Sequence, residues 1–253
     1  MNYLKYFKYT FITLLIVHLG AMVFEPLVQY SFSWSKILAT WDKWQTYNSA
    51  MIALSSALVA TYFAAKQSEE IRLRKLKAAN TVLPEILSHL CNYLEDTISI
   101  YKKVRPHFEN IGTVPNHKNI ADKTKDLTIP TYDHSLIILI KECVEHSSEK
   151  ESAGLRKLLR ELQKHSARLK KKINEIQDPE STHITTKHTI DDGIVHTIQV
   201  YSLISNIFPW AREDKPTCTS EISPEALESS VGILEISNVE FSEVFRTLGL
   251  RNS

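Results

Sequence analysis

Hydrophobic and polar positions divide the chain into two parts. Two apolar runs of twenty residues, 9–28 and 46–65, lie near the N-terminus, and no charged residue interrupts the second run. Because a helix rises 1.5 Å per residue, each run would extend about 30 Å, the thickness of a bilayer's hydrocarbon core. The pattern therefore predicts two transmembrane helices. The alternatives are a cleaved signal peptide for the first run and a buried, alanine-rich helix of a soluble protein for the second.

The segment between the runs, residues 29–45, has the pattern of a helix that lies in the membrane surface. One helical face carries only apolar side chains: Trp34, Ile37, Leu38, Trp41 and Trp44. Lysine and arginine number two before the first run, two between the runs and five after the second. Positive charge concentrates on the cytoplasmic side of membranes, so this count predicts an inner-membrane hairpin, residues 1–65, with both chain termini in the cytoplasm.

Small residues recur at helical spacing along the second run. Such a face would let another helix approach closely, either within the chain or in a homo-oligomer. The candidate helix-packing face consists of Ser49, Ala53, Ala57, Ala60 and Ala64.

Residues 66–253 have the length and composition of a cytosolic domain with its own core. The whole chain has a mean hydropathy of −0.18, 23% charged residues and a net charge of +1, so no strong overall field is expected. Its three cysteines are scattered and form no CxxC pair, which is typical of reduced cytosolic thiols.

Apolar residues alternate four and three apart in three stretches, 83–104, 155–176 and 227–248. This spacing predicts long amphipathic helices and hence a mainly α protein with a cytosolic helical bundle, although each stripe could instead be a dimer seam. A polar residue, Ser166, interrupts the second stripe. The helix that begins in the second apolar run should continue to residue 83, where Pro84 kinks or restarts it. A Ser223–Pro224 pair suits the start of the last helix.

Two segments between these helices follow other patterns. The segment from about residue 106 to residue 131 contains a glycine, several prolines and many polar side chains, and this composition predicts a loop. Residues 132–149 are a short helix or a buried strand, which periodicity alone does not distinguish.

One segment, residues 183–200, favours a small β-hairpin, because β-branched residues flank Asp192-Gly193. The alternative is a helix that is capped by Asp191 or Asp192 and runs to Phe208. Whether the segment's three histidines could share a metal depends on the hairpin register, and no carboxylate or cysteine spacing supports a site. No metal is therefore predicted at His183, His188 and His196.

Motifs for catalysis are absent from the sequence. The six glycines form neither GxGxxG nor a phosphate-binding loop, and there is no GxSxG, HExxH or zinc-type cysteine pattern. Arg160 and His165 match the R-x4-H spacing of helical HEPN ribonucleases, but nine arginines and ten histidines produce about one such match by chance. We therefore expect neither an enzyme nor a cofactor, with a membrane-anchored ribonuclease as the distant alternative.

The segment 156–172 is strongly basic and carries a single acidic residue, Glu161. The candidate basic face consists of Arg156, Lys157, Arg160, Lys164, Arg168, Lys170, Lys171 and Lys172. It could bind anionic lipid, bind nucleic acid, or pair with the acidic C-terminal stretch that holds Glu225, Glu228, Glu235, Glu240 and Glu243. Pairing within the chain is the first expectation, and the lack of nearby aromatic residues disfavours nucleic acid.

One pattern covers about fifty residues around the second run: Trp44-Gln45-Thr46, the alanine-rich run, Gln67, the basic stretch 72–77, Ala78-Ala79, Leu83-Pro84 and Leu87-Ser88. It resembles a family of small bacterial inner-membrane proteins of undefined function. It implies a bacterial inner-membrane anchor and supplies no catalytic residue. The two-span layout also resembles the membrane effectors that accompany retrons in anti-phage defence.

Together these patterns predict a non-enzymatic effector that perturbs the inner membrane when a partner or trigger releases it. The expected partners are the lipid bilayer and a protein or ribonucleoprotein bound to the cytosolic domain. The alternative is a membrane-tethered scaffold or regulator that binds a cytosolic protein or nucleic acid.

Overall fold

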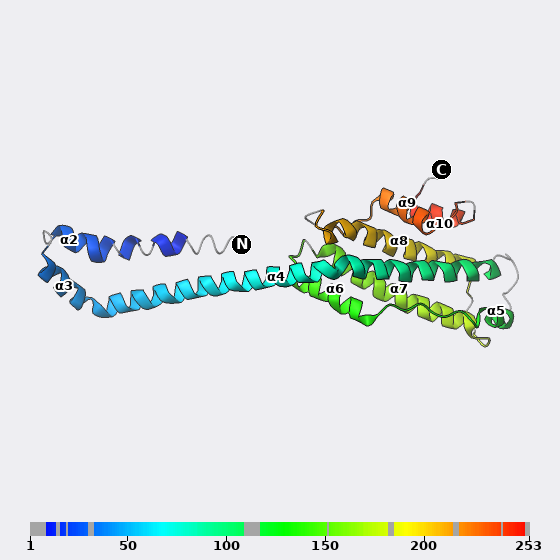
Figure 1. Ribbon diagram of the computed structural model, residues 1–253, viewed down its shortest axis with the longest axis horizontal. Helices are drawn as coiled ribbons and strands as arrows, with labels where there is room; N and C mark the ends of the chain where they lie inside the picture. The colour runs from blue at the N-terminus through cyan, green and yellow to red at the C-terminus, as the bar shows by residue number, and fades with distance from the viewer. Residues whose placement is uncertain are drawn as a thin grey trace. The chain divides into compact units, whose positions relative to one another are not determined.

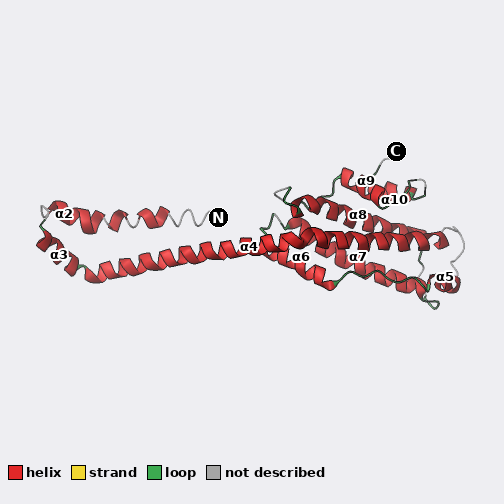
Figure 2. Ribbon diagram, in the orientation of Figure 1, coloured by secondary structure: helices red, strands yellow, loops and turns green. Residues whose placement is uncertain are grey.

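The computed structural model describes residues 9–13, 16–18, 20–29, 33–108, 117–150, 152–181, 185–214, 218–238 and 240–250. Within these ranges the chain is mainly helical and contains no strand (Figure 2). It divides into two compact units, Met1–Leu73 and Arg74–Ser253.

The first unit contains short N-terminal helical segments and the beginning of a long helix. Its elements are a π-helical turn η1 (Gly20–Phe24), α2 (Glu25–Gln29), α3 (Trp34–Lys43) and the N-terminal part of α4 (Gln45–Val104) (Figure 1). The ring centroids of His18 and Tyr47 lie 5.8 Å apart, so the first helical segments lie beside α4 at this point. The predicted helix between the apolar runs is confirmed as α3, which buries Ile37 and exposes Trp34 and Leu38.

Only one described helix is long and apolar enough to cross a membrane, and its apolar segment lies in α4. None of the residues in that apolar window is buried. A chain of exposed apolar side chains over this length is unfavourable in water and favourable in lipid. By length and composition this helix is a candidate membrane span, and the two-helix hairpin remains a prediction.

Helix α4 continues through Pro84, which neither ends nor restarts it. Proline removes one backbone hydrogen bond and strains the preceding turn. Here the flanking Leu83 and Leu87 are fully buried, so tertiary packing holds both sides of the proline in the helical conformation. The predicted stripe from Leu83 to Val104 is confirmed as the buried face of this half of α4.

The second unit is a helical bundle built on α4, α7 and α8. The C-terminal half of α4 is joined to α7 (Ala153–Gln177) by the Tyr93–His165 contact and to α8 (Lys187–Ala211) by the hydrogen bond from Tyr201 to Glu95, and α8 contacts α7 directly. Helices α5 (His117–Thr124) and α6 (His134–His146) pack on α7, whereas α9 (Pro224–Ile233) and α10 (Ser242–Leu248) pack on α8 (Figure 1). All three cysteines are free and buried within this unit.

The β-hairpin prediction for residues 183–200 is wrong over the described residues, because residues 187–200 belong to α8. Thr186, not Asp191 or Asp192, caps this helix through a reciprocal pair of hydrogen bonds with Thr189. β-Branched residues favour strands only weakly, and here they are buried on several sides of a central helix, where tertiary packing decides. Residues 182–184, including His183, lie outside the described residues.

Three other segments differ from the sequence pattern or complete it. The predicted loop 106–131 contains a 3-10 turn, η2 (Arg105–Phe108), and helix α5. Residues 134–146 are a helix, α6, which Asp133 caps through the backbone N–H of Ser135. Ser223 caps α9 with Pro224 in its first turn, as predicted.

The stretch 227–248 is two helices and not one, because α9 ends at Ile233 and α10 begins at Ser242. Glu235 adopts a left-handed φ of 52°. The Ile236 N–H donates to the carbonyl of Val231, which is the pattern of a Schellman C-cap. Lys102 of α4 donates to the carbonyls of Leu234 and Glu235 at 3.0 and 2.8 Å and so stabilises this helix end.

Candidate functional site

A buried chain of polar groups joins the three central helices of the bundle. Tyr93 Oη of α4 lies 3.0 Å from Nδ1 of His165 on α7, and Nε2 of His165 lies 2.9 Å from Oγ1 of Thr197 on α8. Thr197 donates its own hydrogen to the carbonyl of Gly193 at 2.8 Å. Its oxygen must therefore accept from His165, which assigns the proton of His165 to Nε2 and leaves Nδ1 to accept from Tyr93.

This arrangement keeps His165 neutral. Burial, with a smaller contribution from the neighbouring His196, lowers the pKa of His165 from 6.5 to about 3. Burial likewise raises the pKa of Tyr93 to about 12. Both ring nitrogens and the phenol therefore serve as hydrogen-bonding groups that fix α4, α7 and α8 together, and neither is placed to exchange protons near neutral pH.

A buried ion pair fixes the N-terminal part of α8. Nε of Arg105 in η2 donates to Oδ1 of Asp191 at 2.7 Å, and both side chains are almost fully buried. The guanidinium also lies over the ring of Phe241, 4.5 Å from its centroid. Asp191 is thus a structural residue that holds η2 and the segment before α10 against α8.

The two residues of the R-x4-H match do not share a surface. The side chain of Arg160 is 64% exposed and pairs with Glu161, whereas His165 is only 2% exposed and points into the core. A residue five positions along a helix is rotated by about 140°, which accounts for the separation. This geometry gives the ribonuclease hypothesis no support.

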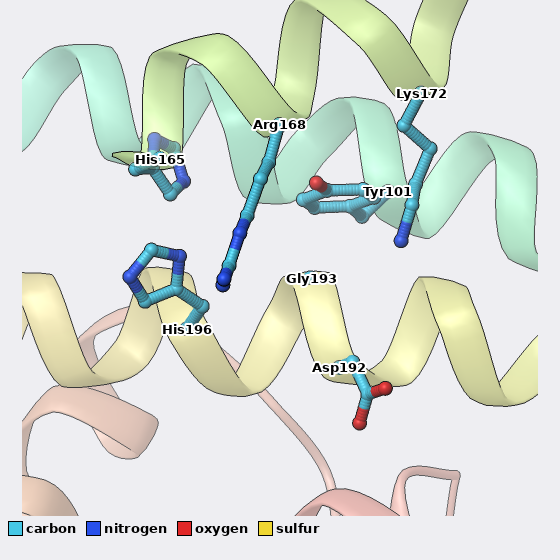
Figure 3. A pocket seen from close by; sticks show the side chains of 7 residues that line it. All are labelled: Tyr101, His165, Arg168, Lys172, Asp192, Gly193 and His196. Atoms are coloured by element: carbon cyan, nitrogen blue, oxygen red, sulfur yellow. The ribbon is translucent and has the colours of Figure 1, made fainter. Parts of the chain in front are cut away.

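A pocket of about 330 Å³ lies beside the His165 network, between α4, α7 and α8. Figure 3 shows the side chains of Arg168 and Lys172 extending from α7 into the space in front of α8. Tyr101 forms its α4 wall, and Gly193 lets the ring approach, because a Cβ there would lie 2.6 Å from Cζ of Tyr101. The full lining is Tyr101, His165, Arg168, Lys172, Asp192, Gly193 and His196.

His196 and Lys172 are the half-buried polar groups of this pocket. Nε2 of His196 lies 3.3 Å from a carboxylate oxygen of Glu161, which belongs to α7. Nζ of Lys172 donates to the backbone carbonyl of Thr189. Burial lowers the pKa of both side chains below their usual values.

The predicted basic face is exposed in parts, but its contacts are not with the acidic C-terminal stretch. Its described ion pairs lie within α7, namely Arg160 and Lys164 with Glu161 and Lys171 with Glu175. The remaining described contacts are to backbone carbonyls, because α9 and α10 pack on α8 and leave the basic side of α7 uncovered by their glutamates. The expected pairing with the acidic stretch is therefore not among the described contacts.

The other predicted sets are placed as follows. Ser49, Ala53, Ala57, Ala60 and Ala64 are all exposed on α4. His188 pairs with Asp192 on the exposed side of α8, and His196 pairs with Glu161. The two histidines are eight residues apart on one helix, or about 12 Å along its axis, too far to ligate one metal. No group of metal-binding side chains occurs among the described residues.

Sequence reasoning missed the Tyr93–His165–Thr197 chain and the Arg105–Asp191 pair. One signal was present, because the polar residues Thr97 and Ser166 interrupt otherwise apolar stripes. Thr97 is fully buried and donates to the carbonyl of Tyr93, and Ser166 directly follows His165 on α7. Polar breaks in the stripes thus marked the neighbourhood of the network, although not its members.

Over the described residues, the chain is a mainly helical protein with one helix long and apolar enough to cross a membrane and a helical bundle with a pocket lined by Arg168 and Lys172. Comparison with protein-family models, curated proteins and solved structures finds no match.

Proposed function

We propose that the protein is an inner-membrane effector of bacterial anti-phage defence that perturbs the membrane when a partner or trigger acts on its helical bundle. In this proposal residues 46–65 of α4 cross the bilayer. The aromatic Trp44 stands before this segment and the basic stretch 72–77 follows it, an arrangement typical of membrane anchors. The resemblance to two-span retron effectors supports the defence role.

The observation that carries the proposal is the continuity of α4. It is one helix from Gln45 to Val104, with an unburied apolar window near its start and fully buried leucines from Leu83 onward. The apolar window and the buried leucines thus belong to one helical segment of the chain. A partner that shifts the bundle could therefore change how the membrane segment associates.

In this proposal the activity resides in the membrane segment and needs no catalysis. The exposed face of Ser49, Ala53, Ala57, Ala60 and Ala64 is suited to close helix association, where backbone contact replaces the hydrophobic force that lipid removes. Association between copies along this face would be the step that perturbs the bilayer.

The test is a comparison of two double leucine variants of the apolar run. Ala53→Leu with Ala57→Leu enlarges the small face, whereas Thr61→Leu with Ala65→Leu enlarges exposed positions about 80–120° away on the same helix. Membrane potential, followed with a dye during induction, and cell growth are measured beside the amount of protein in the membrane. We expect the first variant to reach the membrane and leave the potential intact, and the second to depolarise cells as the wild type does.

Two outcomes would contradict the proposal. If the wild type leaves the potential unchanged, the membrane is not the target. If Arg160→Ala alone abolishes growth inhibition, the exposed surface of α7 carries the activity instead of the membrane segment.

A second candidate is a membrane-tethered scaffold or regulator. It is favoured by the exposed cations Lys170 and Arg168, which take part in no described ion pair. This candidate predicts that the wild type never depolarises the membrane and that Lys170→Glu weakens co-purification of a cytosolic partner.

A further inference from the structure

The pocket between α4, α7 and α8 concentrates positive charge. Arg168 and Lys172 are four residues apart on α7, so they lie on one face, and both extend toward α8 (Figure 3). The volume of about 330 Å³ is at the lower end of the range found for small-molecule sites. The pocket is therefore large enough for a small organic anion.

The donors of these two cations are mostly unused. Arg168 takes part in no ion pair or hydrogen bond of the described residues, and a guanidinium carries five N–H donors in a planar fork. Lys172 donates one hydrogen to the Thr189 carbonyl, which leaves two for a ligand. The pocket thus offers a bidentate donor and a second cation on the same side.

Carboxylates act on Lys172 and His196, but none pairs with Arg168 among the described contacts. Asp192 lines the pocket, but its carboxylate points away from Arg168 (Figure 3) and lies 3.7 Å from His188. Glu161 is shared by Lys164 and His196. Burial is the main cause that lowers the pKa of both Lys172 and His196. The carboxylates of Asp192 and Glu175 raise the pKa of Lys172 and Glu161 raises that of His196, whereas the positive charge of Arg168 lowers both.

We propose that this pocket binds a small phosphorylated molecule, with Arg168 holding two phosphate oxygens and Lys172 supplying the second positive charge. The guanidinium fork matches the spacing of phosphate oxygens, and charge-assisted bonds of this kind are about twice as strong as neutral ones. The Tyr101 ring and the His196 imidazole line the rest of the space and suit an organic group attached to the phosphate. A phosphate monoester of mononucleotide size meets these requirements.

The site is also placed to respond to its ligand. Its walls come from three helices, and the adjacent Tyr93–His165–Thr197 chain fixes those helices to one another. A bound anion would join α7 to α8 through Arg168 and Lys172 and should stabilise the bundle in proportion to its affinity. This inference stands apart from the membrane proposal, because binding is measured on the purified chain and needs no membrane activity.

The experiment measures binding of adenosine 5′-monophosphate to the full-length chain in non-ionic detergent, by calorimetry and by the shift in melting temperature, at one fixed ionic strength. Adenosine and inorganic phosphate are the companion probes. The variants are Arg168→Gln and, as a matched control, Lys170→Gln, an exposed lysine of α7 that does not line the pocket. Circular dichroism checks that both variants are folded.

We expect the wild type to bind the monophosphate, inorganic phosphate to compete with it, and adenosine to bind far more weakly. Arg168→Gln should weaken binding about tenfold or more, because it removes a charge-assisted bidentate contact. Lys170→Gln should change it by about twofold at most, because an exposed charge is screened by salt. The proposal is overturned if neither phosphate probe binds, if adenosine binds as tightly as its monophosphate, or if Lys170→Gln weakens binding as much as Arg168→Gln.

Discussion

Lowering the pH should destabilise the bundle through His165. Burial lowers its pKa from 6.5 to about 3, so at pH 5 the unfolded chain binds a proton at this residue and the folded chain does not. The contribution of neutral His165 to the free energy of unfolding is therefore fully present above pH 6.5. It is lost as the pH falls from 6.5 toward about 3. Acid lowers the stability because the pKa of this basic group is lower in the folded chain than in the unfolded chain, so the unfolded chain takes up the proton first.

The magnitude follows from the same shift. Each pH unit between the unfolded and folded pKa values changes the free energy of unfolding by about 1.4 kcal/mol. Between pH 7 and pH 5 the contribution of His165 is therefore a loss of about 2 kcal/mol. His165 is 2% exposed, so solvent screening should reduce this value little.

The assay compares the wild type with His165→Gln, which stays neutral at every pH and keeps a donor and an acceptor. Guanidinium unfolding of the full-length chain in neutral detergent is followed by circular dichroism at pH 7 and pH 5. The variant should be less stable at pH 7, because the hydrogen bonds to Tyr93 and Thr197 fit glutamine poorly. Its loss between the two pH values should nevertheless be smaller than that of the wild type by about 2 kcal/mol.

All other titrating groups are present in both proteins. The difference between their losses of stability from pH 7 to pH 5 therefore measures the contribution of His165. If the two proteins lose stability in parallel between pH 7 and pH 5, then His165 is not held neutral in the folded state and the assigned network is wrong.

Further predictions concern packing, charge and topology. Gly193→Ala should destabilise the bundle by about 1–3 kcal/mol, because its Cβ would lie 2.6 Å from the ring of Tyr101. Gly232→Ala is the control: its Cβ meets nothing within 4 Å, so it should be neutral or stabilising when the melting temperatures are compared. Asp191→Ala should lower the free energy of unfolding by about 3–5 kcal/mol, because it leaves the buried Arg105 without its carboxylate. Asp192→Ala, at a side chain that is 54% exposed, should lower it little, and equal losses of the two variants in denaturant unfolding would contradict this prediction. A reporter fused to Ser253 should be active only in the cytoplasm, and a periplasmic signal would refute the predicted topology.

The sequence alone determined most of the helical framework. The four-and-three spacing of Leu83 to Val104 and Leu155 to Ile176 specifies which face of a helix is apolar, and a face of that width has to be buried. The same holds for local signals such as the Ser223–Pro224 helix start, which depends only on neighbouring backbone groups. The apolar run of α4 is likewise a property of composition and length.

Tertiary packing decided the segments where local preferences were weak or opposed. β-Branched residues favoured a hairpin near Gly193, but their burial among α4, α7 and α9 is satisfied only when the segment is a central helix. Pro84 was compatible with a helix end, and the buried leucines on either side kept α4 continuous. A lysine of α4, Lys102, reaches the end of α9 across 132 positions of sequence, which no local pattern reveals.

The candidate site was the part that only the tertiary structure could assemble. Arg160 and His165 looked related because they share a helix, yet one is exposed and the other is held in the core. Tyr101 lies more than sixty positions before Arg168 and Lys172 in the sequence, and it meets them only because of how α4 and α7 pack. Periodicity specifies the face on which a residue lies, and packing alone specifies what that face meets.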